Sequence, residues 1–158
     1  MKALKEMHEN RIMHRDIKPE NIMLRGEDSL EPVIVDFGLS ANVDANDYIF
    51  YRCGTPGYVA PEITILKKGE KVDPECDIFS VGAILHIMLV RRPLFDGKKF
   101  EEVYENNKNM KFNLSGSIYK GIDADAMDLL TRMLKANPKE RIKASEVLTH
   151  PFLEGWKM

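Results

Sequence analysis

Two short polar clusters hold the residue types that could bind a metal ion and balance a negative charge. The first, residues 14–21, has the sequence HRDIKPEN and places Asp16, Lys18 and Asn21 close together. The second, Asp36-Phe37-Gly38, adds another carboxylate. Carboxylate and amide oxygens are ligands of hard cations, and a lysine ammonium carries a compact positive charge. These side chains suit chemistry at an anionic, metal-bound group, provided that the fold brings them together.

A β-hairpin is the element expected to position both clusters. Two short β-prone runs, residues 22–24 and 33–35, are separated by a polar stretch that contains Gly26 and Pro32. The first cluster ends directly before one run, and Asp36 follows the other. Because paired strands lie side by side, the hairpin should hold both clusters at one edge.

Helices are expected over most of the remaining chain. Apolar residues at helical spacing predict four helices, at Leu4, Met7 and His8; at Phe100, Val103 and Tyr104; at Ala126, Leu129, Leu130, Met133 and Leu134; and at Ala144, Val147 and Leu148, ending near Pro151. From Asp77 onward the sequence is apolar almost all round until Pro93, which predicts a helix buried in the centre of the domain. Residues 39–57 have no periodic pattern and are expected to form a long loop.

Composition favours one globular domain in a reducing compartment. The chain has 158 residues, 44% of them hydrophobic, and 23 basic against 25 acidic side chains leave a net charge of −2. This balance favours neither nucleic acid nor an anionic membrane as a partner. Cys53 and Cys76 are expected to be free thiols. The sequence has no signal-peptide pattern, and the longest apolar stretch, residues 79–90, is too short for a bilayer. A cytoplasmic location is expected, with a nuclear one left open.

Three ordered motifs give the sequence a family resemblance. Residues 14–21, Asp36-Phe37-Gly38 and Ala60-Pro61-Glu62 resemble the catalytic loop, metal-binding triplet and Ala-Pro-Glu segment of eukaryotic protein kinases. Further landmarks extend the resemblance over nearly the whole chain, namely residues 54–58, residues 77–82, Arg141 and His150-Pro151-Phe152. The resemblance implies a mainly α fold, the C-terminal lobe of the kinase domain, built as a helix bundle with one hairpin. This partial domain would span residues 1–158 and begin within the helix before the catalytic loop.

The resemblance implies ATP and Mg²⁺ as cofactors and assigns roles to the polar clusters. Asp36 would bind Mg²⁺ bridging the ATP phosphates, and Asn21 a second Mg²⁺. Asp16 would orient the substrate hydroxyl rather than remove its proton, since an ordinary aspartate has a pKa near ~3.9. Lys18 would neutralise the transferred phosphate. The residues expected around the nucleotide and metal are Lys18, Glu20, Asn21, Met23 and Asp36; Met23 would pack beneath the adenine, with a plain core methionine as the alternative.

The resemblance also implies serine/threonine substrates. Lys18 and Gly54-Thr55-Pro56 follow the pattern of serine/threonine kinases, and residues 53–62 are most similar to the calcium/calmodulin-dependent group. The Thr55 hydroxyl would bond Asp16 and Lys18, while Pro56 and Val59 would line the pocket for the residue after the phosphoacceptor. Glu20 would contact a basic substrate residue, with a solvated surface glutamate as an equal alternative.

Other matching residues are implied to be architectural. Asp77 would hold the backbone of the catalytic loop, with His14 and Phe37 stacked above it and Gly38 completing the metal-binding triplet; a simple helix N-cap is the alternative for Asp77. Glu62 and Arg141 would form a buried ion pair. In this type of kinase Arg15 often pairs with a phosphorylated loop residue. Residues 41–53 contain no serine or threonine, only Tyr48 and Tyr51, so control of this loop by another serine/threonine kinase is not expected here.

The 158 residues lack the other half of a kinase's ATP site. They contain no Gly-x-Gly pair, and residues 1–10 are too few for the lobe that carries the glycine-rich lid, strand lysine and helix glutamate. We therefore expect weak ATP binding and little turnover by this polypeptide alone, and apolar side chains exposed where a second lobe or regulatory partner would bind. The alternative is a kinase-like interaction protein that transfers no phosphate.

Overall fold

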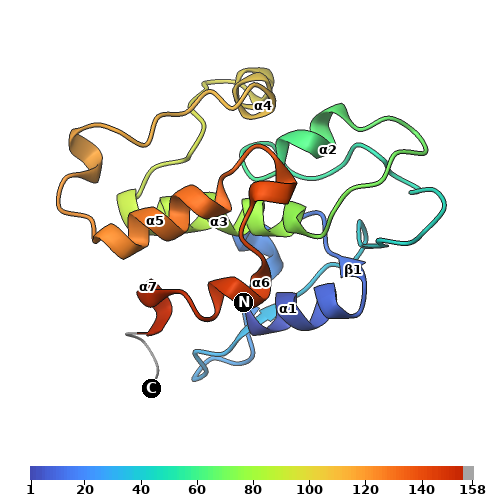
Figure 1. The fold of residues 1–158 in the computed structure, drawn as a ribbon, viewed down its shortest axis with the longest axis horizontal. Helices are drawn as coiled ribbons and strands as arrows, with labels where there is room; N and C mark the ends of the chain where they lie inside the picture. Colours follow the sequence, from blue (N-terminus) through green and yellow to red (C-terminus); the bar gives the residue numbers. More distant parts are fainter. Residues whose placement is uncertain (155–158) are drawn as a thin grey trace.

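The chain folds into a mostly helical structure with two very small sheets. The computed structural model describes residues 1–154, and the central element is α3, the longest helix (Figure 1). The helices are α1 (Lys2–Glu9), α2 (Pro61–Ile65), α3 (Glu75–Val90), α4 (Phe100–Lys108), α5 (Ala124–Met133), α6 (Ala144–Val147) and α7 (Pro151–Glu154), with 3₁₀ turns at η1 (Pro19–Asn21), η2 (Ser117–Tyr119) and η3 (Pro138–Glu140). This confirms the predicted mainly α class; the last four residues of the predicted domain lie outside the described part.

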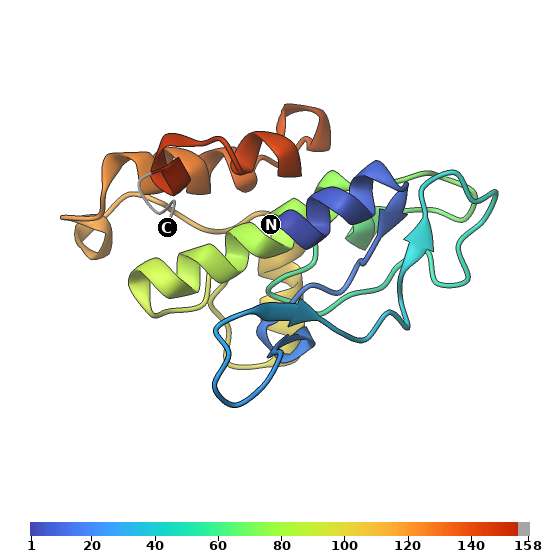
Figure 2. The same cartoon turned by 90° about the horizontal axis from the view of Figure 1, so that it is seen from below.

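The elements are arranged in layers about α3. Figure 2 shows α5, α6 and α7 on one side of α3, and the β2–β3 hairpin on the other. Gly82 allows α5 to approach closely, because a Cβ at this position would lie 2.9 Å from side-chain atoms of Met133 and Leu134. The predicted burial of α3 holds as far as His86, which is 2% exposed, but fails near the C-terminal end, where Met88 is 73% exposed.

The predicted hairpin is present and starts one residue earlier in its second strand. Strand β2 (Ile22–Leu24) pairs antiparallel with β3 (Pro32–Ile34), and Ile22 faces Ile34. A second pair of strands was missed, in which β1 (Ile12–Met13) pairs with β4 (Ala41–Asn42). Of these two strands, β4 lies inside the segment predicted as a loop. Strands of two residues have no alternation to detect. Helices α2 and α7 were also not predicted. Helix α7 begins at Pro151, where we expected helical structure to end.

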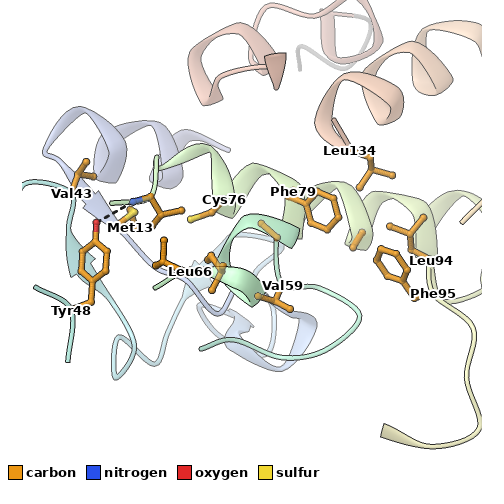
Figure 3. Close-up of a cluster of buried hydrophobic side chains, with 14 of the residues drawn as sticks. Met13, Val43, Tyr48, Val59, Leu66, Cys76, Phe79, Leu94, Phe95 and Leu134 are labelled. Carbon is orange, nitrogen blue, oxygen red and sulfur yellow. Dashed lines mark hydrogen bonds between the residues drawn. The ribbon is translucent and has the colours of Figure 1, made fainter. Parts of the chain in front are cut away.

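Two apolar clusters form the core and meet at α3. Phe79 belongs to the cluster that contains the α2 and loop residues (Figure 3). Its neighbour Ile78 belongs to the cluster formed with α1, α5 and α6. Both side chains are fully buried. Because adjacent residues of α3 point into different clusters, this helix ties the two halves of the core together.

Part of the apolar surface remains open. A groove of about 870 Å³ lies between α1, the hairpin and the half-exposed face of α3, and residues of α5, α6 and α7 complete its lining. On the hairpin, Met23 is 58% and Leu24 54% exposed, and Phe37 nearby is 50% exposed. Exposed apolar side chains also occur elsewhere, with Leu30 and Ile49 each 91% exposed, so the prediction that they mark the surface for a second lobe stays a prediction. Within residues 1–154, no helix is long and apolar enough to cross a lipid bilayer.

Candidate active site

The loop of residues 14–21 is fixed to the start of α3 by one buried carboxylate. Asp77 is 0% exposed; its Oδ2 accepts a hydrogen bond from the His14 amide and its Oδ1 one from the Arg15 amide, both at 2.8 Å. His8 Nε2, which sequence reasoning missed, lies 3.0 Å from Asp77 Oδ2. The N-cap interpretation of Asp77 is wrong, because α3 begins two residues earlier and is preceded by Pro74. The Asp77 carboxylate instead binds backbone amides of the loop of residues 14–21.

Asp16, Lys18 and Thr55 form a closed hydrogen-bonded triangle. The Thr55 hydroxyl donates to Asp16 Oδ1 at 2.7 Å. Lys18 Nζ lies 2.9 Å from Asp16 Oδ2 and donates to Thr55 Oγ1 at 2.9 Å. Both hydrogen bonds expected of Thr55 are therefore present. They join the loop of residues 14–21 to a segment far along the chain.

This triangle keeps Asp16 ionised. Burial raises the pKa of Asp16, but the hydrogen bonds from Lys18 and Thr55 and the charge on Lys18 outweigh it, so the pKa falls below its usual 3.8. The hydrogen bond to Asp16 raises the pKa of Lys18 despite partial burial, with smaller contributions from the charges of Asp16, Glu20 and Asp36. At neutral pH the site thus holds a carboxylate that accepts hydrogen bonds beside an ammonium that donates them.

Asn21 is oriented by Asp16 so that its amide oxygen remains available. Its Nδ2 donates to the Asp16 backbone oxygen at 2.9 Å and to Oδ2 at 3.3 Å. In the part of the chain that the structure describes, no group donates to Asn21 Oδ1. The side chain is 6% exposed. A buried, oriented amide with an unused oxygen is suited to coordinate a hard cation.

Asp36 is held beside this loop by its neighbours. The Val35 amide donates to the Asn21 backbone oxygen at 3.0 Å, and His14 Nε2 donates to the Val35 oxygen at 3.0 Å. The rings of His14 and Phe37 lie edge to face at 5.2 Å. Asp36 itself has a left-handed backbone, with φ 62°, and an exposed side chain. An unusual backbone conformation held on both sides commonly marks a functional position.

The oxygen donors fit Mg²⁺ better than a softer metal. Asn21 and Asp36 offer an amide and a carboxylate oxygen, and no group of three or more His, Cys, Asp or Glu side chains gathers as a metal site among the described residues. Mg²⁺ is commonly held by one or two carboxylates and completes its coordination with water and phosphate. The donor set is therefore compatible with Mg²⁺ that arrives together with a phosphate ligand.

A small pocket adjoins the triangle on the Thr55 side. Its volume is about 180 Å³, and Pro56 and Val59 contribute to its wall. Asn107 on α4 is fully buried; its Oδ1 accepts from the Gly57 amide and its Nδ2 donates to the Val59 oxygen, both at 2.9 Å. Sequence reasoning missed Asn107, although it continues the i, i+3, i+4 pattern of α4 as the i+7 member. A polar residue in an apolar stripe was the available signal.

A comparison with protein families identifies the fold. The family model described as "Protein kinase domain" matches residues 1–153. The chain belongs to the protein kinase family.

Several curated kinases are similar to this chain over nearly all of its length. It is 34% identical to Myosin light chain kinase A of Dictyostelium discoideum over 97% of the chain and 51% of that protein. It is 36% identical to Calcium-dependent protein kinase 5 of Plasmodium falciparum (isolate 3D7) over 98% of the chain and 27% of that protein, and 35% identical to Serine/threonine-protein kinase PEPKR2 of Arabidopsis thaliana over 97% and 31%. The chain thus spans at most about half the length of these kinases.

The expected ion pair of the kinase scaffold is present. Arg141 donates to both carboxylate oxygens of Glu62, from Nη1 at 2.7 Å and from Nη2 at 3.0 Å. The Arg141 side chain is 0% and the Glu62 side chain 17% exposed. The segment that carries Thr55, residues 54–60, is called the Thr55 segment. Because α2 directly follows it, this ion pair fixes the C-terminal end of the Thr55 segment to the helical core.

Two residues predicted to contact a ligand, Met23 and Glu20, have exposed side chains. Met23 is 58% exposed, so its interpretation as a plain core methionine is wrong for this chain. Glu20 is exposed, and its charge adds to burial in raising the pKa of Tyr58. The charge of Glu20 is therefore felt at Tyr58, and its predicted contact with a substrate peptide stays a prediction beside the solvated-glutamate alternative.

Gly54→Ala is expected to displace the segment that carries Thr55. Gly54 has φ +99°, and an added Cβ would lie 2.9 Å from the Arg15 backbone oxygen. Gly69 is the matched control, because it has φ +84° but no atom within 4 Å of an added Cβ. The backbone strain of about 1–2 kcal/mol is common to both, whereas the close contact belongs to Gly54 alone.

Urea unfolding measures the outcome. Gly54→Ala should lose at least ~1 kcal/mol more of the free energy of unfolding than Gly69→Ala, as expected when a close contact adds to backbone strain. Equal losses in the two variants would show that the approach of Gly54 to the Arg15 backbone is not a tight constraint.

Proposed function

We propose that this chain is the C-terminal lobe of a serine/threonine protein kinase, which transfers the γ-phosphate of ATP to hydroxyls of protein substrates. The observation that carries the proposal is the closed triangle of Asp16, Lys18 and Thr55, with the oxygens of Asn21 and Asp36 held beside it. An acceptor for a hydroxyl proton, a cation for phosphate and oxygens for Mg²⁺ are the groups that phosphoryl transfer requires.

In this proposal Asp16 orients the attacking hydroxyl. Each carboxylate oxygen can accept more than one hydrogen bond, so Asp16 can receive the substrate hydroxyl while it keeps Thr55 and Lys18. Its lowered pKa makes it a weak base, which fits a loose transition state in which the proton leaves late. Orientation is therefore its main contribution.

Lys18 supplies charge neutralisation. An ammonium at about 4 Å from a phosphate oxygen contributes at most ~4 kcal/mol at an effective dielectric near 20. Asn21 and Asp36 would hold Mg²⁺, which neutralises the ATP phosphates when bound. Lys18 already has Asp16 and Thr55 as partners, so its ammonium is positioned before substrate arrives.

The proposal includes substrate preference and setting. Glu20, exposed near the Thr55 segment, favours substrates with a basic residue before the phosphoacceptor, and the pocket beside Pro56 and Val59 receives the residue after it. We place the kinase in the cytoplasm, with a nuclear location also open, and propose an N-terminal lobe or regulatory partner as its further contact. Nucleic acid and membranes are not among the proposed partners.

Phosphate transfer to a basic serine peptide tests the proposal. The 158-residue chain and the longest product of the reading frame that contains it are each incubated with labelled ATP and Mg²⁺. We expect little label from the chain alone, and label on serine from a longer product that supplies a glycine-rich lid and strand lysine. EDTA and a serine-to-alanine peptide should abolish labelling. A lid-bearing product that binds the peptide and transfers nothing would favour the interaction-protein alternative.

A further inference from the structure

Arg15 is a buried cation whose partners carry no full negative charge. It is 4% exposed, with Nε donating to the Leu39 oxygen at 2.8 Å and Nη1 to the Phe50 oxygen at 2.7 Å. Among the residues that the structure describes, its guanidinium has no ion pair. A buried charge without a counter-charge is costly unless other groups stabilise it.

The remaining partner of Arg15 is the ring of Tyr48. Arg15 Cζ lies 4.8 Å from the ring centroid, within the range of a favourable cation–π contact. Tyr48 is 5% exposed and packs in the core with Met13 and Val43 (Figure 3). Its hydroxyl accepts from the Val72 amide at 3.4 Å. Tyr48 is thus anchored at its hydroxyl and covers the guanidinium with its face.

Residues 41–53 offer no serine, threonine or nearby tyrosine whose phosphate could replace Tyr48 as the partner of Arg15. Residues 41–53 contain no serine or threonine, and Tyr51 is 38% exposed, with its ring centroid 5.9 Å from Arg52 Cζ rather than beside Arg15. Both carbonyls that Arg15 binds, those of Leu39 and Phe50, belong to this segment or adjoin it. Arg15 therefore holds the backbone at Leu39 and at Phe50 together, and the Tyr48 ring covers its guanidinium.

We propose that Tyr48 is a positioning residue: by covering Arg15, it holds residues 41–54 in the arrangement that places Thr55 on Asp16, without phosphorylation of this segment. The coupling to the site is short. Arg15 precedes Asp16, and its backbone oxygen is the atom that a Cβ added at Gly54 would approach most closely. The significance for catalysis rests on the proposed kinase function; the positioning itself does not.

Two variants separate the ring's contact with Arg15 from simple packing. Tyr48→Phe keeps the aromatic face and loses the hydroxyl, whereas Tyr48→Leu keeps apolar volume and loses the face. Arg52 is exposed within the segment, so trypsin cleavage after Arg52, followed by mass spectrometry, reports its opening. Loss of a desolvated cation–π contact should speed cleavage of Tyr48→Leu about tenfold. Tyr48→Phe should be cleaved only about two- to threefold faster than wild type, because the hydrogen bond that it loses is long, at 3.4 Å.

The control is Phe95→Leu, which alters the same core cluster at a position outside the segment. Cleavage after Arg52 should stay near the wild-type rate in that variant, and phosphatase treatment should leave the wild-type rate unchanged. Equal cleavage of Tyr48→Leu and Tyr48→Phe, or faster cleavage of wild type after phosphatase, would overturn the proposal.

Kinetics of the lid-bearing product add an independent readout. If Tyr48 positions the substrate segment, Tyr48→Leu should raise the peptide KM severalfold, and Tyr48→Phe should restore it, as expected when a substrate-binding surface loosens. A peptide KM that is equal in both variants contradicts the catalytic part of the proposal. Should no form transfer phosphate while the cleavage pattern holds, the proposed function falls and the positioning by Tyr48 stands.

Discussion

Asp16→Asn is expected to lower the rate of phosphate transfer by about 10³-fold, within the range for loss of a positioned acceptor, while the chain stays folded. Three donors converge on the Asp16 carboxylate, from Thr55, Lys18 and Asn21. A carboxamide has only one acceptor oxygen and turns an NH₂ group toward one of these donors. Transfer to the basic serine peptide by the lid-bearing product measures the loss, and the far-UV circular dichroism spectrum checks the fold.

The pH dependence of folding gives a second test of the same variant. Because the folded pKa of Asp16 lies below 3.8, its contribution to stability is present above about pH 4 and is lost as pH falls through the folded pKa. The difference in urea midpoint between wild type and Asp16→Asn should therefore shrink below pH 4. The same ionised state makes the transfer rate insensitive to Asp16 titration near neutral pH.

Asp44→Asn is the matched control. Asp44 is an exposed aspartate that also pairs with a basic residue, Arg11 at 2.7 Å, yet it lies outside the triangle. The transfer rate of Asp44→Asn should stay within about twofold of wild type, since exposed ion pairs contribute little to stability. Full activity of Asp16→Asn in a product that also shows metal-dependent transfer would remove Asp16 from the mechanism.

The sequence predicted best what depends on local periodicity. The stripe Ala126 to Leu134 became α5, and the apolar run after Asp77 became α3. The hairpin also followed from short-range signals. Exposure of the end of α3 could not be predicted, because the same apolar residues can face a core or an open groove. Only neighbouring elements decide between these environments.

Long-range polar contacts were predictable only through the family resemblance. The bonds of Asp77 to His14 and Arg15 join residues more than 60 positions apart, and no spacing rule predicts them. Tyr48 lies in a stretch without periodicity, so its burial and contact with Arg15 depend on how the segment folds back. Strand β4 was not predicted for the same reason, because its two residues gain their conformation from pairing with β1.

Arg141→Met should produce the largest loss of stability, about 3–5 kcal/mol, the range for breaking a buried ion pair by removing one partner. The guanidinium satisfies both Glu62 oxygens and also donates to three backbone oxygens, those of Lys135, Glu75 and Ala136. Methionine restores part of the volume but none of these hydrogen bonds. Single domains are stable by only ~5–15 kcal/mol, so the urea midpoint should fall sharply or the variant should fail to fold.

A double variant separates the lost charge balance from the lost carbonyl contacts. Glu62→Met combined with Arg141→Met removes the uncompensated carboxylate, so it should recover part of the stability that Arg141→Met loses. Arg25→Met is the surface control: Arg25 and Glu31 are paired at 2.8 Å, with side chains 64% and 59% exposed, and its loss should be within about 0.5 kcal/mol. Similar urea midpoints for Arg141→Met and Arg25→Met would mean that the Glu62–Arg141 pair does not hold the Thr55 segment to the core. The close approach of Gly54 to Arg15 and the two hydrogen bonds of Asn107 would then have to position Thr55 on their own.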